Sequence, residues 1–218
     1  MADVALAEFL PNVLPMVEGC PRNMALNELR NTAIDFCANT WYDQRTVTGT
    51  LNGGDQMLTL APPDGFSVVQ FVSIHVDGAL KPLIPMTRMQ MDNLVPAWQI
   101  TTGQCPTHVI AHSATELRLW PSMDAAASAR NYTAVLALKP SRSGNVVSGE
   151  VFEDCYDTVV AGALARLLRM PGKPWTDLKQ AGISSEQYLR GMNAAKVAVL
   201  SQFGSARTFL DRPTFGVH

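Results

Sequence analysis

The chain has 218 residues, of which 47% are hydrophobic and 17% charged, with a formal net charge of −2 and a sequence pI near 6.1. A charged fraction well below the roughly 25% of an average soluble domain predicts that other protein covers part of the surface. The charge balance excludes the broad basic footprint of nucleic-acid-binding proteins, so any contact with DNA is expected to be independent of its sequence. The longest charge-free apolar stretch, Thr158 to Ala165, is far shorter than the roughly 20 residues needed to cross a bilayer, so no membrane span is expected.

An opening arm is expected up to Gly19, because Pro11 and Pro15 interrupt it. Met1-Ala2-Asp3 lacks the basic start of a secretory signal, so export is not expected. The cysteines are scattered without a Cys-x-x-Cys pair, which predicts small buried hydrophobes rather than disulfides; they are Cys20, Cys37, Cys105 and Cys155.

A helix is predicted from about Met24 to Trp41, where apolar residues recur at helical spacing. From Arg45 to Leu138 the period changes to that of strands, with one hairpin around Asn52-Gly53-Gly54 and another around Asp77-Gly78. The expected strands are 45–51, 56–60, 68–76, 79–83, 98–102, 108–111, 116–120 and 132–138. Residues 124–130 are expected to be a loop, and 140–149 a linker to the last helices.

Residues 151–204 predict two amphipathic helices that pair antiparallel, joined by a break at 170–175. The first opens with Glu150, Glu153, Asp154 and Asp157, which the helix dipole favours, and closes with Arg166 and Arg169. The second is expected to begin with a capping box of Ser184 and Gln187 and to stop at Gly204. Small residues give both helices flat, close-packing surfaces for helix or subunit contacts, which favours assembly over chemistry; they include Gly162, Ala165, Gly191 and Ala195.

The predicted fold class is therefore α+β. A helical layer comes from residues 21–41 and 150–204, and an antiparallel β-sandwich or small barrel is inserted at 45–139. Residues 205–218 are expected to form an extended C-terminal tail, because Pro213 prevents a helix and the segment is too short for another core element.

No catalytic, cofactor or metal site is predicted. Four residues have zinc-ligand types at close spacing, but the second tight Cys or His pair of a closed site is missing; they are Cys105, His108, His112 and Glu116. Gly172-Lys173 fails the P-loop pattern on both sides, since Leu167 and Pro174 stand where Gly and Ser or Thr are required. A nucleophile elbow and papain-like or caspase-like cysteine phrases are also absent from the sequence.

Several phrases of the chain resemble the head-to-tail adaptor, or connector, proteins of tailed bacteriophages, related to tail tubular protein A. Cys20-Pro21 leads into Ala33-Ile34-Asp35-Phe36-Cys37-Ala38-Asn39-Thr40, and the sheet contains Val76-Asp77-Gly78 and Leu117-Arg118-Leu119-Trp120-Pro121. Above all, residues 163–175 end in Leu-Leu-Arg-Met-Pro-Gly-Lys-Pro-Trp, and an alanine-rich last helix follows. The resemblance covers about residues 21–204, and the opening arm and final tail have no clear match.

This resemblance implies a structural virion protein at the head–tail junction, assembled in the host cytoplasm. It implies a homo-oligomeric, dodecameric ring that joins the portal protein to a tail nozzle or tail-terminator protein. Genome DNA would pass through the lumen without sequence-specific binding. A different reading is a small-ligand or carbohydrate-binding β-domain with a helical dimerisation hairpin, for which Trp98, Trp120 and Tyr132 are candidate platforms.

The tail combines apolar anchors with charges, a composition suited to ordering on a partner. Because terminal segments of the resembled family reach across to the portal, the tail is predicted to be a portal-docking arm; its residues are Arg207, Phe209, Leu210, Asp211, Arg212 and Phe215. The alternatives are a disordered end and a strap on the protein's own surface.

Overall fold

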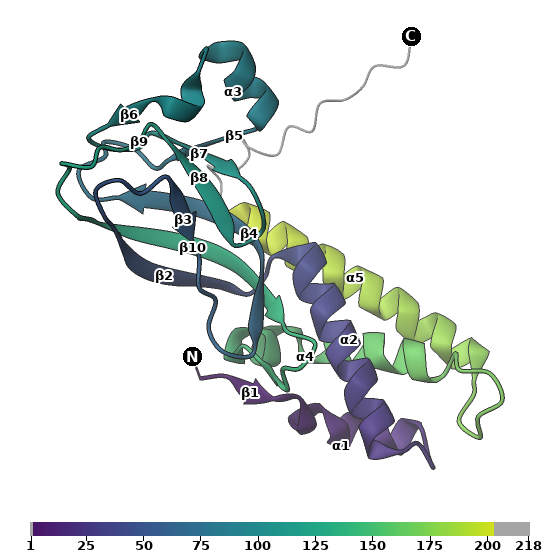
Figure 1. Cartoon of the computed structure of the whole chain (residues 1–218). Helices are drawn as coiled ribbons and strands as arrows, with labels where there is room; N and C mark the ends of the chain where they lie inside the picture. The colour runs from purple at the N-terminus through teal and green to yellow at the C-terminus, as the bar shows by residue number, and fades with distance from the viewer. Residues whose placement is uncertain (1, 203–218) are drawn as a thin grey trace, which may run out of the picture. The chain divides into compact units, whose positions relative to one another are not determined.

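The structure, a computed structural model, describes residues 2–202 (Figure 1). The described residues form two compact units: unit 1 contains residues 2–43 and 139–202, and unit 2 contains residues 44–138. Unit 1 is helical and unit 2 is built mainly of strands, so the fold class is α+β, as predicted.

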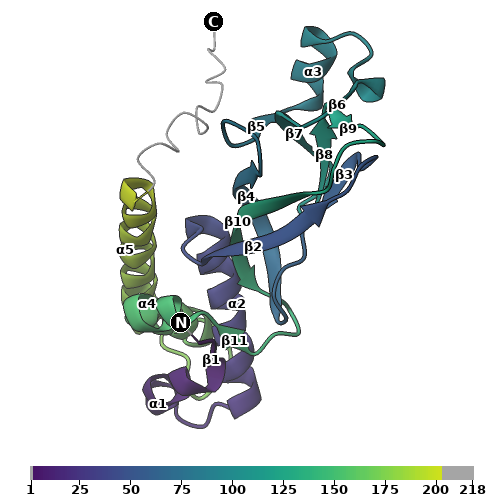
Figure 2. The same cartoon turned by 90° about the vertical axis from the view of Figure 1, so that its left-hand side faces the viewer.

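The opening arm is a folded part of unit 1. It forms β1 (Val4–Ala5), η1 (Leu6–Phe9), α1 (Leu10–Val13) and η2 (Leu14–Met16). Strand β1 pairs antiparallel with β11 (Val146–Val147), as Figure 2 shows. Five apolar residues of the arm are buried, so it adds to the core; they are Leu6, Phe9, Leu10, Val13 and Val17. Pro11 and Pro15 stand in first turns, where a missing N–H costs nothing.

Helix α2 (Arg22–Thr40) confirms the first predicted helix within two residues at each end. Trp41 ends it in the left-handed conformation, with φ 55°, and its N–H donates to the Cys37 carbonyl. The helix buries one face, which includes Leu29 and Phe36, in the core of unit 1.

Helices α4 (Gly149–Leu167) and α5 (Leu178–Gln202) confirm the predicted antiparallel hairpin (Figure 1). Gly172 turns the chain with φ +69°, and Trp175 packs back into the core. The predicted start of the second helix was wrong. Asp177 precedes α5 and accepts from the Gln180 N–H at 3.0 Å, whereas Ser184 is buried inside the helix.

Unit 2 contains three sheets. The order of the first is β2 (Gln44–Leu51), β10 (Arg130–Pro140) and β4 (Phe66–Val76), and that of the second is β3 (Met57–Thr59), β8 (Glu116–Trp120), β7 (His108–Ala111) and β5 (Ile84–Met86). The third pairs β6 (Thr102–Gly103) with β9 (Ser122–Met123). The β5–β7 and β6–β9 pairs are parallel, so the pairing is not purely antiparallel as expected. The strands described form no closed barrel, which excludes the small barrel among the expected alternatives.

Both predicted hairpins were wrong as strand pairs. The turn at 52–54 joins β2 to β3, but β2 pairs with β10 and β3 with β8. After the turn at Gly78, the chain runs back beside β4 for a short distance, where the Leu83 N–H donates to the Ile74 carbonyl. The next strand, β5, pairs with β7 instead of β4. Pro82 lacks the donor that a continued ladder would need.

A helical excursion replaces the predicted strand at 98–102. It consists of α3 (Arg88–Leu94), which begins with a Thr87–Gln90 capping box, and η3 (Trp98–Ile100). Met91 and Trp98 pack against Ile110 in a small cluster of their own. The excursion stands at one end of unit 2, beyond β5, β6 and β9 (Figures 1 and 2).

Candidate functional site

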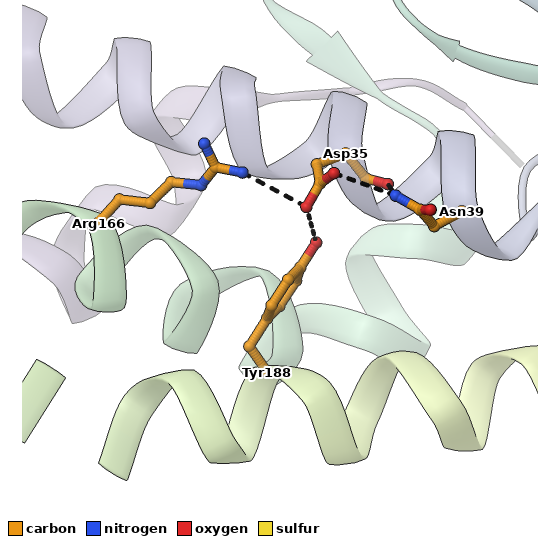
Figure 3. A network of polar contacts seen from close by, with 4 residues as sticks. All are labelled: Asp35, Asn39, Arg166 and Tyr188. Atoms are coloured by element: carbon orange, nitrogen blue, oxygen red, sulfur yellow. Dashed lines mark hydrogen bonds and ion pairs between the residues drawn. The ribbon is translucent and has the colours of Figure 1, made fainter. Parts of the chain in front are cut away.

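The three long helices of unit 1 are joined by a polar network around Asp35 of α2 (Figure 3). The Tyr188 hydroxyl on α5 donates to Asp35 Oδ2 at 2.8 Å, and Arg166 Nη2 on α4 lies 3.3 Å from the same oxygen. Asn39, one turn further along α2, donates to Asp35 Oδ1 at 3.0 Å. One carboxylate thus fixes the relative register of all three helices.

Tyr188 serves in this network as a fixed donor. Burial, and then the hydrogen bond to Asp35, raise the pKa of the Tyr188 hydroxyl well above its usual value, so the phenol stays protonated at neutral pH. The Asp35 and Arg166 side chains are each 41% exposed, a setting in which an ion pair contributes about 0 to 1 kcal/mol. The network therefore orients the helices more than it stabilises them.

Two glycines permit the close approach of α4 to its neighbours. A Cβ at Gly162 would lie 2.5 Å from Thr32 Cγ2 and 2.7 Å from the Tyr188 ring, and a Cβ at Gly191 would overlap the Thr158 side chain. Ala165 and Ala195 are also buried. Of the four positions predicted from sequence for helix or subunit packing, Gly162 and Gly191 therefore lie against side chains of neighbouring helices in the same copy.

The turn between α4 and α5 is closed by its own hydrogen bonds. The Asp177 N–H donates to the Leu168 carbonyl at 3.0 Å, and the Thr176 hydroxyl donates to the Met170 carbonyl. The Lys173 ammonium lies 6.0 Å from the Trp175 ring centroid, a cation–π distance. These contacts give Gly172-Lys173 a structural role at the turn.

Helix α5 carries an outward-facing apolar surface that was not predicted from the sequence. Its large side chains are 44% to 69% exposed; they are Leu178, Ile183, Leu189, Val197 and Leu200. A second exposed apolar group belongs to unit 2 and includes Met89, Leu94 and Ile100 of the helical excursion. The signal was present in the sequence, because positions 178, 189 and 200 recur every 11 residues, or three helical turns.

A family model for the SU10 adaptor protein matches residues 8–208. The chain belongs to the SU10 adaptor protein family. The match includes most of the opening arm, for which sequence reasoning found no family resemblance. No curated protein matches the chain.

Membership of this family makes the protein a bacteriophage head-to-tail adaptor, a structural virion component at the head–tail junction that contacts portal and tail components. Within residues 2–202, no helix is both long and apolar enough to pass through a bilayer.

Two of the residues considered as zinc ligands, His108 and His112, make other contacts. Burial lowers the pKa of His108, whose ring packs edge-on against Trp120 at 5.0 Å and whose Nδ1 lies 2.8 Å from the Thr107 hydroxyl. His112 lies in the turn after β7, where its N–H donates to the Glu116 carbonyl. Across the described part of the chain, no three His, Cys, Asp or Glu side chains gather closely enough to hold a metal ion.

The aromatic residues considered as carbohydrate platforms are core or half-buried residues. Trp98 is buried and donates through Nε1 to Asp92 at 2.7 Å, and Tyr132 packs over Gly49, its partner on β2. Trp120 is half-buried against His108. The predicted portal-docking residues 207–215 lie outside the described residues.

Proposed function

We propose that the adaptor forms a ring, twelvefold as in connectors of the tail tubular protein A type, that joins the portal to the tail and continues the DNA channel. Family membership carries this proposal. The structure supports it through the exposed apolar surfaces on α5 and on the α3 excursion, because such surfaces on a soluble protein mark contacts with other protein.

The role is mechanical rather than catalytic. A rigid helical unit, with α4 packed between α2 and α5 and the opening arm in the same core, suits a subunit that transmits geometry from one ring to another. With a net charge of −2, the chain offers DNA little attraction, so the genome would pass the lumen without sequence-specific binding. The proposed partners are the portal protein on one side and a tail nozzle or tail-terminator protein on the other.

Native mass spectrometry and electron microscopy test the ring directly. The purified protein, alone and mixed with the portal protein from the same phage genome, is expected to give a closed oligomer of twelve times the 23.7 kDa chain mass. A monomer or dimer under both conditions, with no ring in images of the portal mixture, would overturn the proposal.

The C-terminal residues are proposed as the portal-docking arm. Their sequence places Phe209, Leu210 and Phe215 among Arg207, Asp211 and Arg212, a mixture of apolar anchors and register-fixing charges. Deleting 205–218 is expected to leave circular dichroism and the thermal transition nearly unchanged while abolishing portal attachment. A truncated protein that still joins portal to tail would place the docking surface elsewhere, and one that unfolds would assign the tail to its own subunit's core.

A further inference from the structure

Helix α5 uses only one of its faces inside the subunit. Ser184, Tyr188 and Val199 on that face are buried, and Gly191 meets α4. The outer face, defined here by Leu178, Ile183, Leu189, Val197 and Leu200, is exposed. Among the described residues of unit 1, Met16 is the only other exposed large apolar side chain. Contact between copies through unit 1 must therefore use a surface other than the small-residue face of the hairpin.

The outer face of α5 also carries positive charge. Lys179 is exposed and Lys196 half-buried, and neither forms an ion pair within residues 2–202. Arg190 is already paired with Glu186, one turn away, at 2.6 Å. The face is therefore apolar with two uncompensated cations, so an acidic surface with apolar edges would complement it.

The first half of α4 is such a surface. Its four exposed carboxylates lie three or four residues apart and make no ion pair with the described residues; they are Glu150, Glu153, Asp154 and Asp157. Like charges at this spacing repel one another. Phe152 and Tyr156 lie half-buried among them, packed on Phe9 with ring centroids at 5.1 and 4.8 Å.

The helix dipole does not explain this acidic surface, which corrects the interpretation made from sequence. Only Glu150 belongs to the first turn of α4. Glu153 and Asp154 lie beyond that turn, just before the break in helical geometry at Cys155, where φ is −121° and ψ is 15°. Asp154 accepts a hydrogen bond from the Tyr42 hydroxyl at 3.0 Å, so it has a partner within the subunit. Dipole stabilisation falls off within the first turn, so it does not account for Glu153 and Asp157.

We infer that the outer face of α5 in one copy packs against the acidic first half of α4 in the next copy. The two surfaces differ, so the contact is heterologous, the type that closes into rings. The apolar side chains of α5 supply the buried area, and Lys179 and Lys196 supply the positive charge that complements the carboxylates. Because the two lysines lie about 25 Å apart along α5 and the carboxylates span about 10 Å of α4, one of the two lysines contacts them directly and sets the register. The inference rests on the proposed ring and identifies the faces that build it.

Charge reversal tests the pairing. We expect two double variants to lose the ring and give monomer by native mass spectrometry: Lys179→Glu/Lys196→Glu on α5 and Glu153→Lys/Asp157→Lys on α4. If the parent forms a ring only with the portal protein, the variants are measured with the portal protein as well. Combining the two pairs is expected to restore the ring. Leu189→Asp should lose it as well. Thermal transitions close to that of the parent would show that each variant is folded.

Two matched controls are expected to keep the ring. Arg142→Glu reverses an exposed cation of unit 1, and Leu80→Asp adds a charge at an exposed apolar position of unit 2 that lies outside the α3 excursion. Rings that survive both charge-reversed pairs, or a combined variant that stays monomeric, would overturn the pairing while leaving the ring itself standing. A parent that forms no ring, alone or with the portal protein, would instead overturn the proposed function.

Discussion

Gly191 of α5 is the position where one added methyl group tests helix packing most directly. An ideal Cβ there lies 2.7 Å from Thr158 Cγ2 and 2.9 Å from Thr158 Cβ, closer than real carbon atoms approach. Gly182, on the same helix, has no heavy atom within 4 Å of the equivalent point. Replacing either glycine with alanine gains about 1 kcal/mol of helix propensity, so the two variants differ only in what the methyl group meets.

The stability changes follow from these two contributions. Gly182→Ala is expected to raise the free energy of unfolding by about 1 kcal/mol. In Gly191→Ala the same gain is opposed by overpacking of about 1 to 3 kcal/mol, which leaves a net loss of about 0 to 2 kcal/mol. The clash is therefore measured by the difference between the variants, and each kcal/mol of it shifts Tm by roughly 2 to 4 °C for a chain of this size.

Urea unfolding of both variants and the parent measures that difference. Thr158→Ala in the Gly191→Ala background removes the obstructing atoms and is expected to recover most of the loss, a coupling that distant sites do not show. Gly191→Leu, which adds more bulk, is expected to impair ring formation as well. Equal free energies of unfolding for Gly182→Ala and Gly191→Ala would refute the reasoning, because they would show that α5 accommodates the methyl group at position 191 with no loss of stability.

Three further predictions address the start of α5, the polar network and unit 2. Asp177→Ala should lower the free energy of unfolding by about 0.5 to 2 kcal/mol through loss of the cap, and a larger loss in Ser184→Ala would contradict that assignment. Tyr188→Phe should cost about 1 kcal/mol in urea unfolding, because water can replace the lost donor at the partly exposed Asp35, and an unchanged midpoint would show that the bond contributes nothing. Burial lowers the pKa of His108 in the folded state, so the contribution of His108 to stability is complete above the unfolded-state pKa of about 6.5 and is lost as the pH falls. His108→Gln should therefore flatten the decline in the free energy of unfolding below pH 7. Parallel pH profiles for the variant and the parent would contradict this prediction.

The helices were predictable because their signals are local. Apolar spacing located α2 and α4 closely, and the Pro171-Gly172 turn was identified from residue types alone. The start of α5 was missed because two capping patterns compete. Ser184 with Gln187 fits a capping box in sequence, but Asp177 makes the cap and the helix continues through Gly182.

Strand pairing and the polar network were not predictable, because partners far apart in sequence decide them. In the β2–β10 ladder, Leu51 pairs with Arg130, although the adjacent turn at 52–54 favours a local hairpin. Asp35 is 131 residues from Arg166 and 153 residues from Tyr188. Nothing in the local pattern around any of these three residues indicates the others.

The division between buried and exposed residues also explains why the family was identifiable while its contacts were not. Two of the phrases that carry the resemblance contribute to the core of unit 1: residues 33–40 bury Phe36 and Cys37, and residues 163–175 bury Leu167 and Trp175. Helix packing constrains such residues, so they specify the fold. On α5 the exposed leucines lie beside a buried apolar stripe, and a one-sided helical pattern identifies only the buried one. An adaptor needs both, because the buried stripe builds the subunit and the exposed surface is what remains for its neighbours.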